Sequence, residues 1–152
     1  MISKRSNPPG DLNMATENEG GICKDTLAVG KKLVELCNQG KTMDVLDQYY
    51  GDDIVSVEVM GMPEGGMPRE MKGIEAIRGK TKWWYDNHEI HSSSCTGPYP
   101  HGNQFIVIFD MDITPKAGPT AGQRMQMQEA GLYTVANGKI VKEEFFYDMG
   151  DC

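Results

Sequence analysis

The sequence has few cysteines, and their spacing fits neither a disulfide framework nor a zinc site. Four cysteines are spread over the 152 residues without a CxxC pair: Cys23, Cys37, Cys95 and Cys152. Disulfide frameworks are typical of secreted chains, and no apolar signal-peptide core follows Met1. We therefore expect reduced thiols in a cytoplasmic protein.

The sequence also lacks long apolar runs and an excess of positive charge. The longest uninterrupted apolar run is Phe105 to Phe109, whereas a membrane-spanning helix needs about 20 apolar residues. The net charge is −7, which argues against nucleic acid and against an anionic membrane surface as partners. We expect the chain to bind neither a membrane nor a nucleic acid.

No motif in the sequence predicts a metal ion or a nucleotide. His88, His91 and Cys95 have a spacing that metal ligands can have, but residues 88 and 91 of a strand point to opposite faces. Gly79-Lys80-Thr81 is similar to the end of a phosphate-binding loop, yet no strand directly precedes it and the glycine spacing from Gly73 is wrong. No cofactor is therefore expected.

The length of the chain predicts one domain with its own core. Residues 1–22 contain Pro8-Pro9-Gly10 and Gly20-Gly21 and show no periodicity, so we expect a flexible tail. Residues 23–152 are expected to form the domain. Apolar residues at helical spacing predict helices from Asp25 or Thr26 to Asn38, from Thr42 to about residue 50, and after Gly73.

The remaining pattern alternates with a period of two and predicts strands. These strands cover residues 54–60, 88–96 and 104–114, and two further arms flank Asn137-Gly138. An Asn-Gly pair between two such arms predicts a hairpin with a type I′ turn. Consecutive strands without crossover helices exclude a doubly wound sheet and favour an α+β fold, in which a curled sheet packed on helices leaves a cone.

One acidic residue interrupts an otherwise apolar face of the hairpin. Glu129 alternates with apolar and small residues: Met125, Met127, Gly131, Tyr133 and Val135. Gly131 leaves room beside this carboxyl, either for a ligand or for a close approach of the backbone. Glu129 is therefore a candidate to line a cavity.

Four stretches carry a family resemblance: Tyr49-Tyr50-Gly51-Asp52-Asp53, the strand Val55 to Val59, Gly73-Ile74-Glu75-Ala76-Ile77-Arg78, and Gly138-Lys139-Ile140-Val141 leading to Phe145-Phe146-Tyr147-Asp148. Together they resemble the NTF2-like superfamily, within it the SnoaL-like and ketosteroid isomerase-like branch. The resemblance implies a cystatin-like, cone-shaped α+β domain: a curved, mainly antiparallel (mixed) sheet with three helices on its concave side. It also implies a homodimer.

The resemblance further implies roles for two carboxyls. Glu58 lies where isomerase-type members carry a general-base Asp, and Glu129 is nearest to their protonated acid. The helix-1 Tyr of such isomerases has no counterpart within residues 26–38. For Glu58 the alternative is exposure to solvent, because Val55, Val57 and Val59 would then form the inward apolar face.

Further side chains are candidates for ligand contacts, although core or dimer packing also explains the aromatic ones. The candidates are Tyr49, Trp84, Met127, Tyr133, Glu143 and Tyr147. Asp110 and Asp112 alternate with the apolar face of their strand and are expected at a solvated or dimer-facing surface, the alternative being the pocket.

Two functions remain open from the sequence. In the first, the protein binds a small, largely apolar, oxygenated molecule, and Glu58 and Glu129 catalyse isomerisation, cyclisation or dehydration without a cofactor. In the second, the same fold is a ligand-binding or protein-interaction module without catalysis. The two hypotheses differ in whether both carboxyls reach one cavity.

Overall fold

The computed structural model describes residues 12–150, and side chains from residue 24 onward. This part of the chain forms three α-helices, six strands and a short 3₁₀ helix. In chain order they are α1 (Leu12–Asn38), α2 (Thr42–Tyr49), β1 (Tyr50–Val57), η1 (Pro63–Gly65), β2 (Glu70–Lys72), α3 (Ile74–Asn87), β3 (His88–His101), β4 (Gln104–Pro115), β5 (Met125–Ala136) and β6 (Lys139–Phe146).

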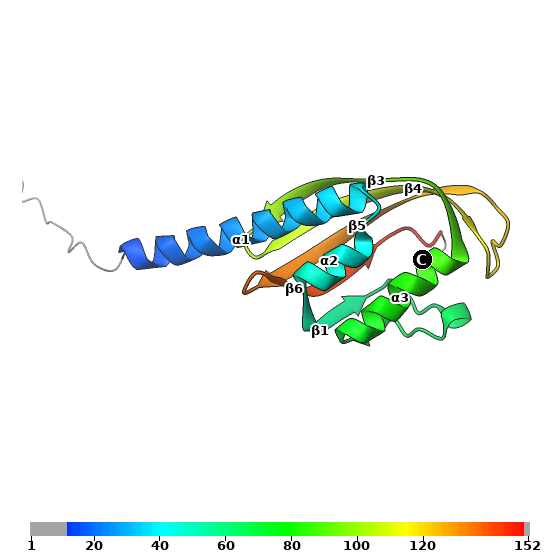
Figure 1. Cartoon of the computed structure of the whole chain (residues 1–152), viewed down its shortest axis with the longest axis horizontal. Helices are drawn as coiled ribbons and strands as arrows, with labels where there is room; N and C mark the ends of the chain where they lie inside the picture. Colours follow the sequence, from blue (N-terminus) through cyan, green and yellow to red (C-terminus); the bar gives the residue numbers. More distant parts are fainter. Residues whose placement is uncertain (1–11, 151–152) are drawn as a thin grey trace, which may run out of the picture.

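The strands form one curved, mixed sheet in the order β2-β1-β6-β5-β4-β3. β1 and β6 run parallel, and the other neighbouring pairs are antiparallel. The three helices lie together on one face of the sheet, α1 beside β3 and α3 beside β1 (Figure 1). The expected α+β, cystatin-like architecture with helices on the concave side is therefore confirmed.

The predicted hairpin is present between β5 and β6. Asn137 has φ of 52° and Gly138 of 73°, the positive values that a type I′ turn requires. Ala136 pairs with Lys139 directly across the turn. Farther along the ribbon Gly131 pairs with Phe145, which sets the face that Glu129 shares with Tyr133.

The structure corrects the start of the first helix. α1 begins at Leu12, so residues 12–22, expected to belong to an irregular tail, have helical backbone, and the first turns project past the sheet (Figure 1). Once the packed segment from Thr26 onward has nucleated the helix, adding further turns costs little. Residues 1–11 lie outside the described residues.

The hydrophobic core lies between the sheet and α1, α2 and α3. Phe105 and Val107 of β4 are completely buried, as the alternation in that strand predicts. Leu33 of α1 and Ile77 of α3 belong to the same buried cluster on the helical side. No helix within residues 12–150 is long and apolar enough to cross a membrane.

The opposite face of β4 meets solvent. Asp112 accepts two hydrogen bonds from Arg124, of 2.9 and 2.8 Å, and Asp110 accepts one of 2.7 Å from Gln128. Both carboxyls therefore belong to the outer face of the sheet and not to the cavity, as favoured from the sequence.

Candidate functional site

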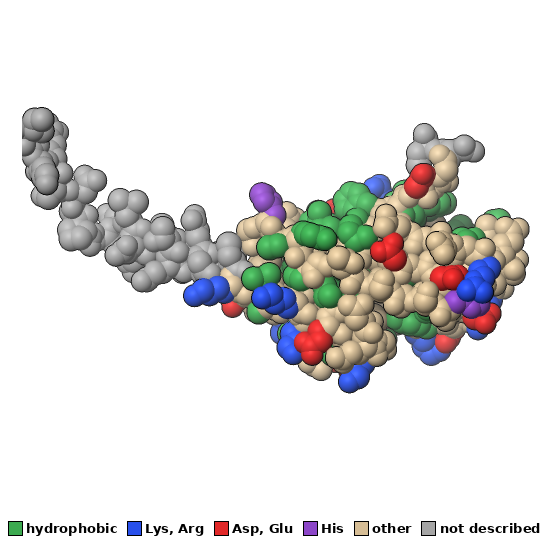
Figure 2. Space-filling view, turned by 90° about the horizontal axis from the view of Figure 1, so that it is seen from above, with side chains coloured by type: hydrophobic (Ala, Val, Ile, Leu, Met, Phe, Trp, Pro, Cys, Tyr) green, Lys and Arg blue, Asp and Glu red, His purple; other side chains and the backbone are tan. Residues whose placement is uncertain are grey.

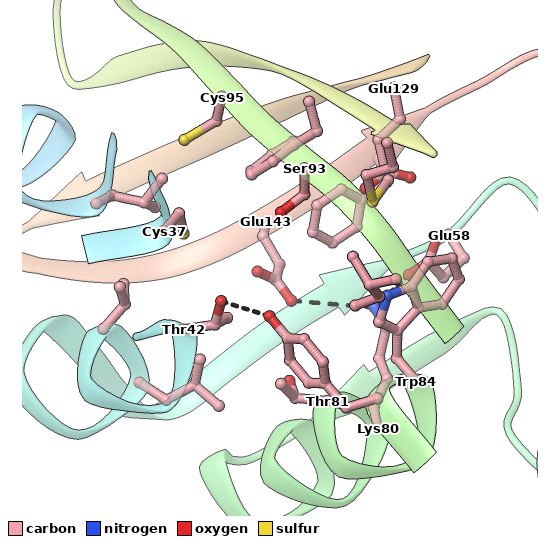
Figure 3. A pocket seen from close by; sticks show the side chains of 18 of the residues that line it. Cys37, Thr42, Glu58, Lys80, Thr81, Trp84, Ser93, Cys95, Glu129 and Glu143 are labelled. Atoms are coloured by element: carbon pink, nitrogen blue, oxygen red, sulfur yellow. Dashed lines mark hydrogen bonds and ion pairs between the residues drawn. The ribbon is translucent and has the colours of Figure 1, made fainter. Parts of the chain in front are cut away.

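A cavity of about 290 Å³ lies between the concave face of the sheet and the helices. Its wall combines apolar, aromatic and acidic side chains from α1, α2, α3 and all the long strands. Figure 3 shows acidic side chains and Lys80 toward one end of this cavity and two thiols, of Cys37 and Cys95, toward the other. A cavity of this size suits a small molecule with a polar end and an apolar body.

The structure brings both candidate catalytic carboxyls into this cavity. Glu58 and Glu129 line it together with the other candidates Trp84, Met127, Tyr133, Glu143 and Tyr147. Tyr49 is the exception: it is the last residue of α2 and lies in a shallow outer groove between α1 and the β5–β6 turn. Its neighbour Tyr50 takes the inward position instead, because β1 begins there and turns this ring into the core.

Glu58 directly follows β1 and points inward because the strand presents its even-numbered residues to the core from Ile54 onward. Ile54 and Ser56 are completely buried and Glu58 is 8% exposed, whereas Val55 and Val57 are only partly buried. The apolar face of Val55 and Val57 is therefore not the inner one. The inner face carries polar groups because other elements supply partners for them, which alternation within one strand does not reveal.

Lys80 of α3 is the partner of these polar groups. Its Nζ forms an ion pair with the Glu58 carboxylate and donates a hydrogen bond of 2.8 Å to the Ser56 hydroxyl. A second carboxylate oxygen, of Glu143, lies 4.0 Å away. The ammonium also lies 4.8 Å from the centre of the Phe145 ring, a favourable cation–π arrangement.

Glu143 is the most deeply buried carboxyl of the site and has its own donors. The Tyr50 hydroxyl donates to one of its oxygens, and the Ser56 hydroxyl donates to the other at 2.7 Å. Burial raises the pKa of Glu143, while Lys80 and these two donors lower it. Its carboxyl therefore fixes Tyr50, Ser56 and Lys80 in one network.

The Glu58 carboxylate is held from two sides. Besides the ion pair with Lys80, it accepts a hydrogen bond of 3.1 Å from the Tyr147 hydroxyl. The Glu58 N–H donates a hydrogen bond of 2.9 Å to the Arg69 carbonyl, and the Glu58 carbonyl accepts one of 3.0 Å from the Arg69 Nε. Burial and the adjacent Glu58 charge raise the pKa of Tyr147, so its phenol stays a donor.

Glu129 differs from both of these carboxyls because no described residue hydrogen-bonds its side chain. Burial, and then the charge of Glu58, raise its pKa to about 7, although Lys80 partly offsets this. A carboxyl with this pKa both gives and takes a proton near neutral pH. No fully buried side-chain nitrogen or oxygen lacks a partner in the described part of the chain, so the Glu129 oxygens must face the cavity.

Gly131 makes room for an aromatic ring and not for a ligand. A Cβ atom at this position would lie 2.7 Å from the Tyr133 ring and 3.2 Å from the Phe109 ring. The Tyr133 ring folds back over Gly131, stacks on Phe105 with 5.1 Å between centroids, and meets Phe145 edge-on. Tyr133 thus forms a rigid wall next to Glu129.

Sequence reasoning missed Lys80, Ser56 and Tyr50 as members of the site. A signal for Lys80 was present, because it stands three residues after Ile77 and four before Trp84 and so shares their inward helix face. A lysine on an apolar helix face predicts a buried acidic partner. Ser56 and Tyr50 carried no comparable signal.

The histidines contact aromatic and hydroxyl groups. His88 stacks on Trp84 with 3.7 Å between ring centroids, and its Nδ1 lies 2.8 Å from the Trp84 carbonyl. His91 Nε2 lies 2.8 Å from the Thr114 hydroxyl. No group of three potential ligands that could hold a metal ion occurs among residues 12–150.

The comparisons with known proteins identify the family and the fold. A family model described as the SnoaL-like domain matches residues 25–147, while no curated protein matches. Among solved structures the chain is similar to a proposed SnoaL-like polyketide cyclase from Mesorhizobium loti, with 43% identity, a TM-score of 0.69, and coverage of 84% of this chain and 97% of that one.

Two more distant structures show the fold alone. A Xanthomonas campestris protein of unknown function with a cystatin-like fold is 12% identical with a TM-score of 0.63, covering 80% of this chain and 89% of that one. An LEH-like epoxide hydrolase of M. tuberculosis is 16% identical with a TM-score of 0.59, covering 85% and 86%. The family model, which matches residues 25–147, shows that the chain belongs to the family of SnoaL-like domains.

Proposed function

We propose that the protein binds a small, largely apolar, oxygenated molecule in this cavity and catalyses a proton transfer, as in isomerisation, cyclisation or dehydration. Glu129 carries the proposal. It is a carboxyl with a pKa of about 7 that faces the cavity and has no hydrogen-bond partner among the described residues. A carboxyl with a pKa near the pH of the solution can both donate and accept a proton, as proton transfer at neutral pH requires. The description of the M. loti relative as a cyclase supports the same reaction class.

The other polar groups of the site would divide the remaining tasks. Glu58, kept next to the Lys80 ammonium, is the carboxylate that removes a proton from carbon. Protonated Glu129 donates a hydrogen bond to the oxygen on which negative charge develops. The aromatic walls of Trp84 and Tyr133 hold the apolar body, and Tyr147 orients Glu58 through its 3.1 Å hydrogen bond.

The test is exchange of carbon-bound hydrogen in a panel of neutral cyclic ketones and enones. The protein is incubated with each probe in D₂O, and loss of the proton next to the carbonyl is followed by NMR. Glu129→Gln should slow catalysed exchange by about 10²–10⁴-fold, the usual contribution of a positioned acid or base. Glu89→Gln changes an exposed carboxyl outside the cavity and should leave the rate unaltered.

A non-catalytic binding module is the second candidate, and one observation favours it. The oxygens of Glu58 and Glu143 are all engaged by Lys80, Tyr147, Tyr50 and Ser56, as in a purely structural network. Under this alternative a probe binds, as shown by line broadening or thermal stabilisation, but its hydrogen exchanges no faster than in buffer. If no probe of the panel binds, the proposed ligand class is wrong.

A homodimer through the outer face of the sheet is part of the proposal. Tyr99, Ile106 and Phe146 are 53, 38 and 56% exposed on this face, and strand pairing joins them through Leu132 and Ala130. Figure 2 shows exposed hydrophobic side chains on the surface seen from above. A continuous apolar strip on a sheet fits a second copy of the chain. Ile106→Lys should give a monomer in sedimentation velocity, and an unchanged dimer would contradict this interface.

We expect the protein to be located in the cytoplasm.

A further inference from the structure

The thiols of Cys37 and Cys95 meet at the end of the cavity away from Glu58 and Glu129 (Figure 3). Cys37 belongs to the last turn of α1 and Cys95 to β3. The Asn38 side chain locks these elements together, since its amide donates to the Cys95 carbonyl at 3.1 Å and its oxygen accepts from the Cys95 N–H at 2.9 Å. The approach of the two thiols is therefore fixed by neighbouring hydrogen bonds.

The two thiols lie near each other at the wall of the cavity. Each thiol is the largest influence on the pKa of the other, and the Cys95 Sγ lies 3.4 Å from the Val34 carbonyl. Both are free thiols and both line the cavity wall, although Cys95 is only 7% exposed. A small molecule that enters the cavity can therefore reach them.

We propose that Cys37 and Cys95 form a peroxide-reactive pair that closes to an intramolecular disulfide at the base of the ligand cavity. The Cys95 sulfur attacks one oxygen of hydrogen peroxide, the O–O bond breaks, and Cys95 becomes a sulfenic acid while one water leaves. The Cys37 thiol then attacks the Cys95 sulfur, the S–O bond breaks, and its proton leaves with the hydroxyl as a second water. Two thiols are oxidised and one peroxide is reduced to two waters.

The environment of the two sulfurs supports this order of events. The neighbouring Cys37 thiol lowers the pKa of Cys95, and the Cys95 thiol together with burial raises the pKa of Cys37. The attacking thiolate is thus expected at Cys95 and the resolving thiol at Cys37. Disulfides in reducing compartments are mostly transient and redox-sensing, and this one would change the shape of the cavity by joining α1 to β3.

The test is peptide mapping of the full chain after treatment with hydrogen peroxide. The reduced protein is exposed to a small molar excess of peroxide, alkylated, digested without reductant and analysed by mass spectrometry. We expect a cross-linked peptide pair containing Cys37 and Cys95, lighter than the two thiol peptides by about 2 Da, which disappears after dithiothreitol. Free thiols at both positions, or a cross-link of either cysteine to Cys23 or Cys152, would overturn the proposal.

Two variants test the order of the steps. In Cys37→Ser, the sulfenic acid of Cys95 has no resolving thiol and should be trapped by dimedone. In Cys95→Ser, dimedone should label Cys37 several-fold less. Equal labelling in the two variants would refute Cys95 as the attacking residue. Because the cross-link is mapped in the unaltered chain, the main test does not depend on the folding of either variant.

Discussion

Lys80 forms an ion pair with Glu58 inside the cavity although their side chains are only 12% and 9% exposed. This ammonium is the one cationic group among the described residues that line the cavity, and it faces the three carboxyls of Glu58, Glu129 and Glu143. It makes direct contact with Glu58, whereas Glu129 has no such partner. Lys80 therefore neutralises Glu58 directly, whereas it acts on Glu129 only by lowering its pKa from a distance.

Replacing Lys80 by methionine should destabilise the fold strongly. Lys80→Met keeps most of the side-chain volume but leaves Glu58 buried without a counter-charge, which costs about 3–5 kcal/mol in the free energy of unfolding. The variant should also raise the pKa of Glu129, because Lys80 lowers it in the native protein. Urea denaturation measures the first effect and NMR titration of labelled glutamate the second.

The matched control is Lys82→Met on the same helix. Lys82 pairs with Asp86 at the surface and its side chain is 74% exposed, so its loss should cost at most about 1 kcal/mol. Equal losses of stability in the two variants would show that the buried ion pair has no special role.

The Glu129 carboxyl should make stability depend on pH in an unusual direction. Its pKa is about 7 in the folded protein against an ordinary value of 4.5. Between these values the folded state binds more protons than the unfolded state, so the free energy of unfolding falls as pH rises from about 4.5 to about 7. Glu129 should account for about 2–4 kcal/mol of this fall, because each pKa unit corresponds to roughly 1.4 kcal/mol.

Glu129→Gln should remove this contribution. Denaturation of both proteins across the same pH range isolates it, since Glu143 titrates in both and cancels in the difference. If the difference in unfolding free energy stays constant with pH, the Glu129 carboxyl is already ionised throughout this range.

Tyr50 should stabilise the site through its hydroxyl. Tyr50→Phe keeps the buried ring but removes a donor to the Glu143 carboxyl, which should cost about 1–3 kcal/mol. It should also raise the pKa of Glu143, because this hydrogen bond lowers it. Tyr49→Phe, one residue earlier and outside the cavity, should change stability by less than about 0.5 kcal/mol. A larger effect at Tyr49 would contradict the placement of these two rings.

Gly131 should not tolerate a methyl group. Gly131→Ala places a Cβ 2.7 Å from the Tyr133 ring, so the ring must move, at a cost of about 1–3 kcal/mol. Near-UV circular dichroism should change along with stability. Gly79→Ala on α3 meets no atom within 4 Å and should stabilise the helix by about 0.5–1 kcal/mol. Similar effects of both substitutions would show that Tyr133 does not need this space.

Local patterns predicted most of the fold because they act within one element. Asn137 and Gly138 are residue types that tolerate positive φ, and both adopt it in the turn. The alternation of Phe105 and Val107 likewise shows which face of β4 is buried. The helix pair and the order of helices and strands along the chain followed from such signals, and the mixed curved sheet followed from the family resemblance.

The site was harder to predict because its polar groups are paired across elements. The inner face of β1 carries the polar Ser56 because Lys80 of α3 and Glu143 of β6 supply partners that lie 24 and 87 residues away in the chain. When only the strand's own sequence is considered, the face with Val55 and Val57 is the one expected to be buried. Tyr49 was predicted to contact the ligand, but the structure places Tyr50 in the cavity wall instead. α2 ends at Tyr49 and β1 begins at Tyr50, so helical periodicity does not predict the direction of the second ring.

The parallel pairing of β1 with β6 has a consequence for how the protein is made. Tyr50 and Ser56 donate hydrogen bonds to Glu143, and Tyr147 donates one to Glu58. Each of these bonds joins residues that are 87 to 93 positions apart in the chain. During synthesis, β1 emerges from the ribosome long before β6, and Ser56 and Glu58 have no sheet neighbour on that side until residue 146 is available. The hydrogen-bond network around Glu58 and Glu143 can therefore be assembled only on a chain that is almost complete, so we expect formation of the cavity to be one of the last steps of folding.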